Sequence, residues 1–254
     1  MKSKVRSRSI TGKLRVHQYL KSDTAIKPYL PKAVSYSLPN LRSMTQQFES
    51  VYVKPNVGSL GKGIFRVQRK SDNYELKSSK NVHKYFSTIN QVHRYINSQS
   101  KKKLFIQQGI DLGKANGQPF DIRSMVQRKP GGPWTFTGMV AKIGKVNKIV
   151  TNHYQGGKPV LMDQLYDRLN LMEEGREKAS KDIKDLSLKI AHTLNAKHPG
   201  MYQMGIDLAR EANGKLWILE VNSRHPQFYA FKRMDRKMYN RMFSFAKSIG
   251  RYKP

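Results

Sequence analysis

The sequence predicts an α+β protein with antiparallel sheets, and three observations lead to that prediction. Short strand-like runs alternate with amphipathic helical stretches along the 254 residues. The pair Asn213-Gly214 lies between two apolar runs, which is a strong signal of an antiparallel hairpin. No long Gly/Ser or Pro linker divides the chain, and no internal repeat stands out. Strands mixed with helices in this order favour an α+β architecture.

The first half of the chain shows helical and strand-like patterns in turn. An amphipathic stretch at 12–23 predicts a helix, which Pro28 and Pro31 bring to an end. Ser87 is the expected cap of a later helix. The other expected elements are a helix at 39–49 with Leu41, Met44 and Phe48 on one face, strands at 51–55, 63–69 and 104–108, and a helix face of Ile89, Val92 and Ile96.

The second half repeats the mixture, with one long helix between two pairs of strands. That helix is expected over 173–197, because Ile183, Leu186, Ile190 and Leu194 recur at helical spacing. The strands are expected at 121–129, 134–144, 204–210 and 215–221, and a basic, aromatic tail closes the chain.

Positive charge is the main compositional feature. The chain has 48 Lys and Arg residues against 17 Asp and Glu residues, a net charge of +31. Such a chain attracts polyanions, and nucleic acid, acidic polypeptide, anionic polymer and nucleotide all qualify. A solvated basic surface without a dedicated partner is the alternative.

Several classes are excluded by what the composition lacks. The chain has no cysteine, which excludes disulfides, thiolate metal sites and cysteine nucleophiles and fits a reducing compartment. No apolar run is long enough to predict a membrane span. The basic N-terminus lacks the apolar stretch of a secretory signal, so we expect a cytoplasmic location.

The hairpin around Asn213-Gly214 predicts a cluster of oxygen-bearing side chains. A two-residue loop would place Asp207 opposite Glu220 and Leu208 opposite Leu219. Because side chains alternate along a strand, the two faces of the hairpin separate cleanly. The core face would carry Ile206, Leu208, Trp217, Leu219 and Val221, and the other face would carry Asp207, Glu220 and Asn222.

Two carboxylates directly opposite each other repel, so something must compensate for their charge. A shared proton is one solution. A divalent cation is the better one, because Asp207, Glu220 and Asn222 offer only oxygen ligands, which suit Mg²⁺ or Mn²⁺. The alternative is an exposed hairpin whose acids point into solvent.

A glycine-rich loop follows the strand that ends near Lys54. Glycines at 58, 61 and 63, with Lys62 among them, would let backbone N–H groups approach phosphates closely. The spacing does not fit a P-loop or a dinucleotide fingerprint. A tight hairpin without a ligand remains the alternative.

Asp121 and Arg123 share one strand face, and Arg123 suits a phosphate or carboxylate, with a plain salt bridge as the alternative.

Seven motifs between Gly12 and Gln227, taken in order, resemble the ATP-grasp superfamily. The resemblance is to the YheC/YheD-type group associated with the endospore coat, with the ribosomal-protein glutamate ligases as more distant kin. The motifs are GKLRVHQYL, YLPKA, VYVKPNVGSLGKGI, FIQQGIDL, FDIRSMVQ, TNHYQGG and GIDLAREANGKLWILEVNSR.

The resemblance implies an ATP-grasp fold, with nucleotide between two α+β subdomains. Residues 13–107 would form the N-terminal part and the lid, residues 108–254 the core with its basic tail, and residues 1–12 a mobile basic arm. Such ligases usually carry a further domain before the first lysine, and we expect it to be largely missing here. Either a protein partner supplies that surface, or the substrate binds the core alone.

The resemblance also implies roles for individual residues. Lys13 and Lys54 would hold the ATP phosphates, and Arg123 would contact the phosphate or acyl phosphate. Many relatives have Glu in the adenine-binding hinge, where this chain has Gln. The covering loop would contain Gly58, Ser59, Gly61, Lys62 and Gly63, and the hinge Gln107, Gln108, Gly109 and Ile110, with Asp111 on the ribose side. Lys142 would be a basic catalytic position, Asn152 a substrate-side residue, and Asp207, Glu220 and Asn222 the Mg²⁺ ligands.

The activity that the resemblance implies is ATP- and Mg²⁺-dependent ligation of a carboxylate to an amine or related nucleophile through an acyl phosphate. The excess of basic residues at both ends of the chain suggests an acidic peptide or anionic polymer as substrate, with non-specific binding of nucleic acid by the same force. The alternative is a non-catalytic ATP-grasp-like protein that binds a polyanion or belongs to a spore coat.

Overall fold

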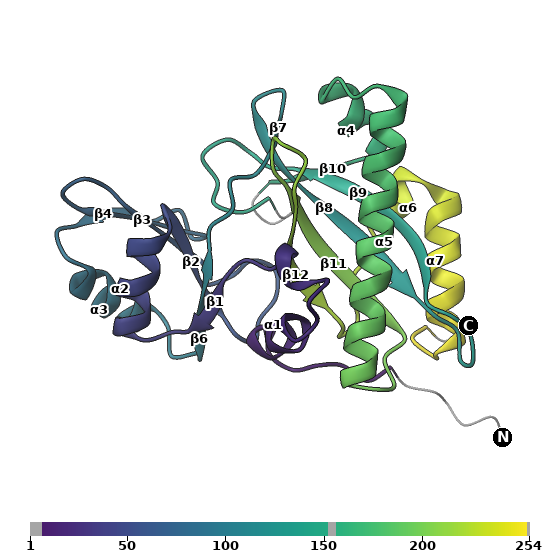
Figure 1. The fold of residues 1–254 in the computed structure, drawn as a ribbon, viewed down its shortest axis with the longest axis horizontal. Helices are drawn as coiled ribbons and strands as arrows, with labels where there is room; N and C mark the ends of the chain where they lie inside the picture. Colours follow the sequence, from purple (N-terminus) through teal and green to yellow (C-terminus); the bar gives the residue numbers. More distant parts are fainter. Residues whose placement is uncertain (1–6, 152–155, 253–254) are drawn as a thin grey trace.

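Two antiparallel sheets with helices packed on them make up the structure (Figure 1). The computed structural model describes residues 7–151 and 156–252. The first sheet has the strand order β1-β6-β2-β3-β4-β5, and the second has the order β10-β9-β8-β11-β12 with β7 beside β8. The α+β class with antiparallel sheets is therefore confirmed. None of the helices in this described part has the length and apolarity that a membrane crossing needs.

The first sheet and its two helices enclose a core of their own. Leu41 and Met44 of α2 and Val92 and Ile96 of α3 pack against Val53 and its neighbours in the sheet. Its elements are β1 (Ala33–Ser35), α2 (Leu38–Gln47), β2 (Ser50–Pro55), β3 (Phe65–Arg69), β4 (Tyr74–Ser78), β5 (His83–Phe86), α3 (Ile89–Gln99) and β6 (Leu104–Gln108).

The cap of α3 differs from the prediction by one residue. Thr88, and not Ser87, is the N-cap, and it forms a capping box with Gln91. The backbone N–H of Gln91 donates to the Thr88 hydroxyl, and the Gln91 side chain accepts from the backbone N–H of Thr88. The two hydrogen bonds satisfy two N–H groups that have no partner within the helix. A capping box needs a Glu or Gln three residues after the N-cap, and Gln91 stands at that position relative to Thr88.

The second sheet is covered by helices on both of its faces. On one face, Ile183, Leu186, Ile190 and Leu194 of the long helix α5 are buried, as predicted. The other face carries the C-terminal helices. The elements are α1 (Lys13–Lys21), a 3₁₀ turn (Lys27–Tyr29), β7 (Lys114–Ala115), β8 (Gln118–Gln127), β9 (Thr135–Ile143), β10 (Lys158–Val160), α4 (Met162–Arg168), α5 (Glu173–Lys197), β11 (Gln203–Arg210), β12 (Leu216–Asn222), α6 (Phe231–Met234) and α7 (Arg236–Ser248).

Residues 7–12, the described part of the expected mobile arm, are anchored on the second sheet. In residues 7–12, Ile10 is buried in the core of the second sheet, and its N–H donates to the buried hydroxyl of Ser223 at 3.0 Å. Helix α1 then connects the two sheets. Val16 and Leu20 join the core of the second sheet, while Asn56, directly after β2, accepts the N–H groups of Lys13 and Leu14.

The β11–β12 hairpin keeps the predicted carboxylate pair but not the predicted loop. The loop has three residues, because the N–H of Glu211 donates to the carbonyl of Lys215, and Gly214 closes it at φ 88°. Its register pairs Leu208 with Ile218, and a β-bulge beyond this pair restores the pairing of Asp207 with Glu220.

The prediction for the core face of β12 was wrong as a result. Leu216 and Ile218 are buried, whereas Trp217 and Leu219, which were expected in the core, are only partly buried. One extra residue in the loop reverses the faces of the strand up to the bulge. Val221, which lies beyond the bulge, is buried as expected.

The C-terminal tail contains helices that the charge pattern concealed. Met242 and Ala246 of α7 pack with Phe228 and Phe231 against Met125 and Val140 of the second sheet. The side chain of Asp235 caps α7 by accepting the N–H of Met238. The tail is therefore a structural layer of the second sheet.

Candidate active site

Charged side chains from both sheets gather where β6 of the first sheet meets β12 of the second. The amide of Gln107 on β6 joins the two, because its Nε2 donates to the carbonyl of Leu219 at 3.2 Å. That carbonyl belongs to the bulged residue of β12. The charged residues around this junction are Lys13 (α1), Lys54 (β2), Asp121 and Arg123 (β8), Lys142 (β9), Asp207 (β11) and Glu220 (β12).

Sheet register places the charged residues of this site opposite one another. Asp207 on β11 lies opposite Glu220 on one side and opposite Arg123 on the other. Asp121 on β8 lies opposite Lys142 on β9. The repulsion expected between Asp207 and Glu220 is thus offset by a cation on the neighbouring strand.

Asp207 is the most heavily bonded group of the site. Nε and Nη2 of Arg123 donate to its two oxygens, each at 2.9 Å. Lys142 Nζ donates to Oδ1 at 2.9 Å, and Asn222 Nδ2 donates to Oδ2 at 3.2 Å. A carboxylate offers about four lone-pair positions. These four donors occupy all of them.

Asp121 and Lys142 form the second ion pair of this group. Lys142 Nζ lies 2.8 Å from Asp121 Oδ1, and the hydroxyl of Thr151 donates to Asp121 Oδ2. Thr151 was not among the predicted site residues. It follows β9 and is the first residue of the motif TNHYQGG, but that motif did not indicate a contact with Asp121.

Burial and pairing perturb the three buried groups in different directions. Burial raises the pKa of Asp121, and the nearby charge of Asp207 adds to that effect. Burial would also raise the pKa of Asp207, but Arg123 and Lys142 outweigh it, so the pKa is lowered. The pKa of Lys142 is raised, because Asp121 and Asp207 together outweigh the effect of its burial.

Lys54 reaches into the junction from the first sheet. Its Nζ donates to Oε1 of Gln107 at 2.6 Å, in a chain of contacts that continues from Gln107 to β12. Burial lowers the pKa of Lys54 to about 8, and the charge of Lys13 acts in the same direction while Glu220 opposes it. The ammonium is thus desolvated and has no carboxylate in direct contact among the described residues, which favours binding an external anion.

Lys13 connects helix α1 with the glycine-rich loop. Its Nζ donates to the carbonyl of Gly58 at 2.7 Å and lies 3.6 Å from Oε1 of Glu220. The loop between β2 and β3 contains positive φ angles at Leu60, Gly61 and Gly63. Ser59 and Lys62 of this loop are exposed. The loop therefore presents backbone in conformations that glycine allows, next to two lysines.

The segment after β6 is fixed by backbone contacts. Gln108 exchanges hydrogen bonds with Lys32, and the N–H of Gly109 donates to the carbonyl of Ser50 at 2.8 Å. A side chain at Gly109 would collide with Ser50, so glycine is required there. Ile110 and Asp111 follow as irregular backbone, and Asp111 is exposed. Asn152, a predicted substrate-side residue, lies outside the described residues.

The oxygen-bearing side chains of β11 and β12 fit a cation that prefers oxygen ligands, provided that Asp207 is freed from one of its hydrogen-bond donors. Within the described ranges the ion-pair partner of Glu220 is Lys13, at 3.6 Å, so Glu220 can still offer a carboxylate oxygen. Asn222 adds an amide oxygen beside it. Asp207 can join them only when one of its four donors moves away. No group of three His, Cys, Asp or Glu residues within 7–151 and 156–252 forms a metal cluster.

Comparisons with known proteins agree on one family. The model of the YheC/D-like ATP-grasp family matches residues 2–249 of the chain. The endospore coat-associated protein YheD of Bacillus subtilis is 27% identical over 255 residues, which cover 94% of this chain and 54% of that protein. The chain thus spans about half the length of this curated relative.

Solved ligases share the fold at low sequence identity. The D-cycloserine synthetase DcsG has a TM-score of 0.56 and 14% identity, covering 93% of this chain and 71% of that chain. The N5-carboxyaminoimidazole synthetase from Staphylococcus aureus, complexed with ADP, has a TM-score of 0.54 and 12% identity, covering 85% and 45%. The fold of the present chain is that of these ligases.

Proposed function

Since the chain belongs to the YheC/D-like ATP-grasp family, we propose that it binds ATP between its two sheets and uses it to join a carboxylate to an amine. The observation that carries the proposal is the convergence of Lys13, Lys54, Arg123 and Lys142 at the junction of β6 and β12. Four cations around one junction suit a nucleoside triphosphate. The structural neighbour from Staphylococcus aureus is an ADP complex, which supports a nucleotide there.

The lysines of the first half would hold the phosphates of ATP. Lys54 donates to an amide oxygen and Lys13 contacts the glycine-rich loop, so both ammonium groups can turn to a phosphate. The loop over 58–63 would cover the phosphates and exclude water. Gln107 to Asp111 would line the adenine and ribose side, with Gln107 already engaged by Lys54.

Arg123 and Lys142 would stabilise the transferring phosphoryl group. Charge on that group spreads over its oxygens in the transition state, and fixed cations are the main source of stabilisation. In this mechanism the substrate carboxylate attacks the γ-phosphorus, ADP leaves, and an amine then displaces phosphate from the acyl phosphate. Asn152 is assigned to the substrate side.

Asp207, Glu220 and Asn222 would hold Mg²⁺, with Mn²⁺ as a substitute. The ion, when bound, supplies positive charge to the phosphate oxygens of ATP. Asp207 also positions Arg123 and Lys142, since it bonds to both. Asp207 would bind the cation only after one of these donors has moved away.

We infer that the substrate is an acidic peptide or an anionic polymer, because the net charge of +31 exceeds what one nucleotide needs.

Residues 13–107 would serve as N-terminal part and lid, and residues 108–254 as core. A protein partner could complete the substrate surface, and nucleic acid would bind non-specifically. The association of the relative YheD with the endospore coat supports a place in the spore. A polyanion-binding protein without turnover is the second candidate.

The decisive experiment measures binding and turnover separately. Calorimetry with Mg-ATP tests the nucleotide site, with Lys54→Gln as the variant and the exposed Lys70→Gln as its matched control. Mg²⁺-dependent ADP release with acidic peptides and amines, read together with product mass, tests ligation. Binding without turnover on any acid–amine pair would favour the second candidate, and absence of Mg-ATP binding would overturn the ligase.

A further inference from the structure

Helix α7 presents a strip of basic residues that lies away from the residues of the ATP site. Its exposed residues fall within one side of the helix, because a helix advances 100° per residue. The opposite side packs on the second sheet through Met242 and Ala246. We call this strip the α7 basic surface, and it consists of Lys129 and the exposed α7 cations Arg236, Lys237, Arg241 and Lys247.

The cations of this surface have no acidic partner among the described residues. No ion pair within the described ranges includes any of the five. Helix α5 shows the contrast, since Lys178 and Lys181 pair with acids one turn away at 2.7 Å. The acid at the start of α7, Asp235, is engaged in capping the helix. Positive charge on this side is therefore left for an external anion.

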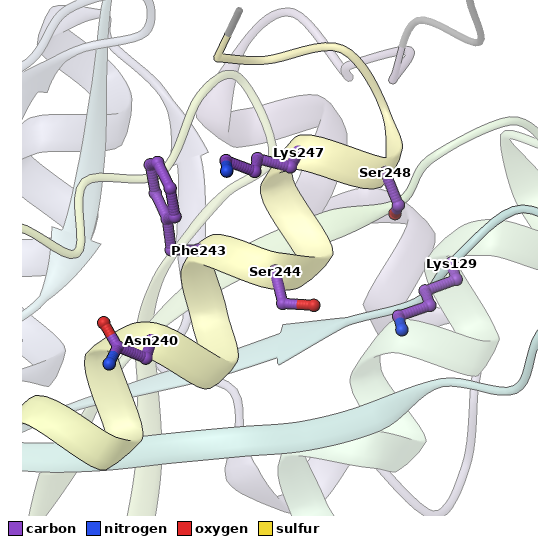
Figure 2. A pocket seen from close by; sticks show the side chains of 6 residues that line it. All are labelled: Lys129, Asn240, Phe243, Ser244, Lys247 and Ser248. Atoms are coloured by element: carbon purple, nitrogen blue, oxygen red, sulfur yellow. The ribbon is translucent and has the colours of Figure 1, made fainter. Parts of the chain in front are cut away.

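A depression of about 540 Å³ runs along α7 and supplies hydrogen-bond donors between the cations (Figure 2). It is lined by Asn240, Ser244 and Ser248, by Phe243, and by Lys247 and Lys129. Figure 2 shows Lys129 extending from the end of β8 toward Ser244 of α7. Amide, hydroxyl and ammonium groups can all donate to a carboxylate.

The α7 basic surface lies on the same face of the second sheet as the ATP site. Alternation along β8 puts Arg123, Met125 and Gln127 on one face, and the last two contact α7. At the other end of this face, Gly205 separates Arg123 from Pro226: a Cβ there would lie 2.5 Å from Arg123 Nη1 and 2.9 Å from Pro226. The segment after β12 therefore packs against Arg123 through Pro226 and against α7 through Phe228, so α7 and Arg123 are joined by one continuous segment on this face.

We propose that the α7 basic surface docks a carboxylate-rich polypeptide segment and leads one of its carboxylates toward Arg123. This inference rests on the proposed function, because a ligase of this kind needs a carboxylate to activate. Nucleic acid matches the charge but brings no carboxylate, so the acidic polypeptide is the better occupant. Docking outside the ATP site lets a long substrate bind tightly while the reacting group stays free to move.

The test measures binding of a fluorescein-labelled oligoglutamate by anisotropy, in the presence and absence of Mg-ATP. The surface variant combines Lys129→Gln, Arg241→Gln and Lys247→Gln. The control combines Lys70→Gln, Lys84→Gln and Lys101→Gln, which removes the same charge from exposed positions in the first sheet and its connecting segments. The surface variant should bind about tenfold more weakly, the combined effect of three exposed ion pairs, and the control should change little. Binding should also weaken as salt rises.

Three outcomes would overturn the docking surface. Equal loss in both variants would mean that net charge alone attracts the peptide. Tighter binding of a single-stranded oligonucleotide of equal charge, with displacement of the peptide, would assign the surface to nucleic acid. Absence of peptide binding to the unmodified chain would remove the surface altogether. Calorimetry with Mg-ATP on the same samples separates this failure from failure of the proposed function, because the three substitutions lie outside the nucleotide site.

Discussion

Substitution of Asp207 by Asn should destabilise the fold by about 3 kcal/mol. The change keeps the shape of the side chain but removes the charge that Arg123 and Lys142 share. Losing one partner of a buried ion pair costs roughly 3–5 kcal/mol, because the other charge stays buried without compensation. The lower end applies here, because the side chains of Arg123 and Lys142 are 20% and 19% exposed.

Thermal and urea unfolding measure this loss. About 3 kcal/mol corresponds to a fall in Tm of roughly 6–12 °C for a chain of this size. Asp182→Asn is the matched control, because Asp182 pairs with Lys178 on the exposed surface of α5. Exposed helical pairs contribute about 0.3–0.5 kcal/mol. If the two variants unfold at the same temperature, Asp207 is not the charged centre of a buried network, and the reasoning fails.

The pH dependence of the stability provides a second test of the prediction for Asp207→Asn. A lowered pKa in the folded state means that ionised Asp207 stabilises the fold above the unfolded pKa of about 4, and that this contribution is lost as pH falls through the folded pKa. Asp121 has the opposite sign, because its raised pKa favours the fold at low pH and the benefit is lost as pH rises. Asp207→Asn should therefore flatten the acid limb of the stability profile.

Three further outcomes are expected. Lys54→Ala should weaken Mg-ATP binding by about 2–3 kcal/mol in calorimetry, and binding to the unmodified chain should weaken above pH 8 as Lys54 loses its proton. Unchanged affinity would exclude a phosphate contact. Glu220→Ala should abolish ADP production and leave the Tm nearly unchanged; retained turnover would exclude the metal role. Ile218→Ala should cost about 2–5 kcal/mol in urea unfolding and Leu219→Ala clearly less, because Ile218 is buried and Leu219 is only partly so. The reverse order would contradict the bulge.

The β11–β12 hairpin shows how far short-range sequence signals reach. The Asn213-Gly214 signal correctly predicted a hairpin and the pairing of Asp207 with Glu220. The loop is one residue longer than predicted, and the bulge beyond Leu208 removes that shift before the carboxylates are reached. A bulge depends on what the neighbouring strand and the first sheet require, so a single strand sequence does not specify it.

Contacts between strands that are distant along the chain could not be predicted from the sequence. Arg123 and Asp207 are 84 positions apart and meet because β8 pairs with β11, across the chain order. The alternation in 121–123 predicted that Asp121 and Arg123 share a face, but nothing in it identified their partners. Helix α7 does carry a helical pattern, because Met238, Met242 and Ala246 recur every four residues, but the many cations between them predicted only a basic tail.

The charges already paired at the junction affect how a nucleoside triphosphate and a divalent cation can bind there. In the described part of the site, Lys13, Lys54, Arg123 and Lys142 face three carboxylates, which leaves one positive charge. Two of these cations are already bonded to Asp207 and Asp121. A nucleoside triphosphate would have to compete with those carboxylates for Arg123 and Lys142. A divalent cation at Asp207 would displace the same donors, so binding of metal and of phosphate at this site should reinforce each other.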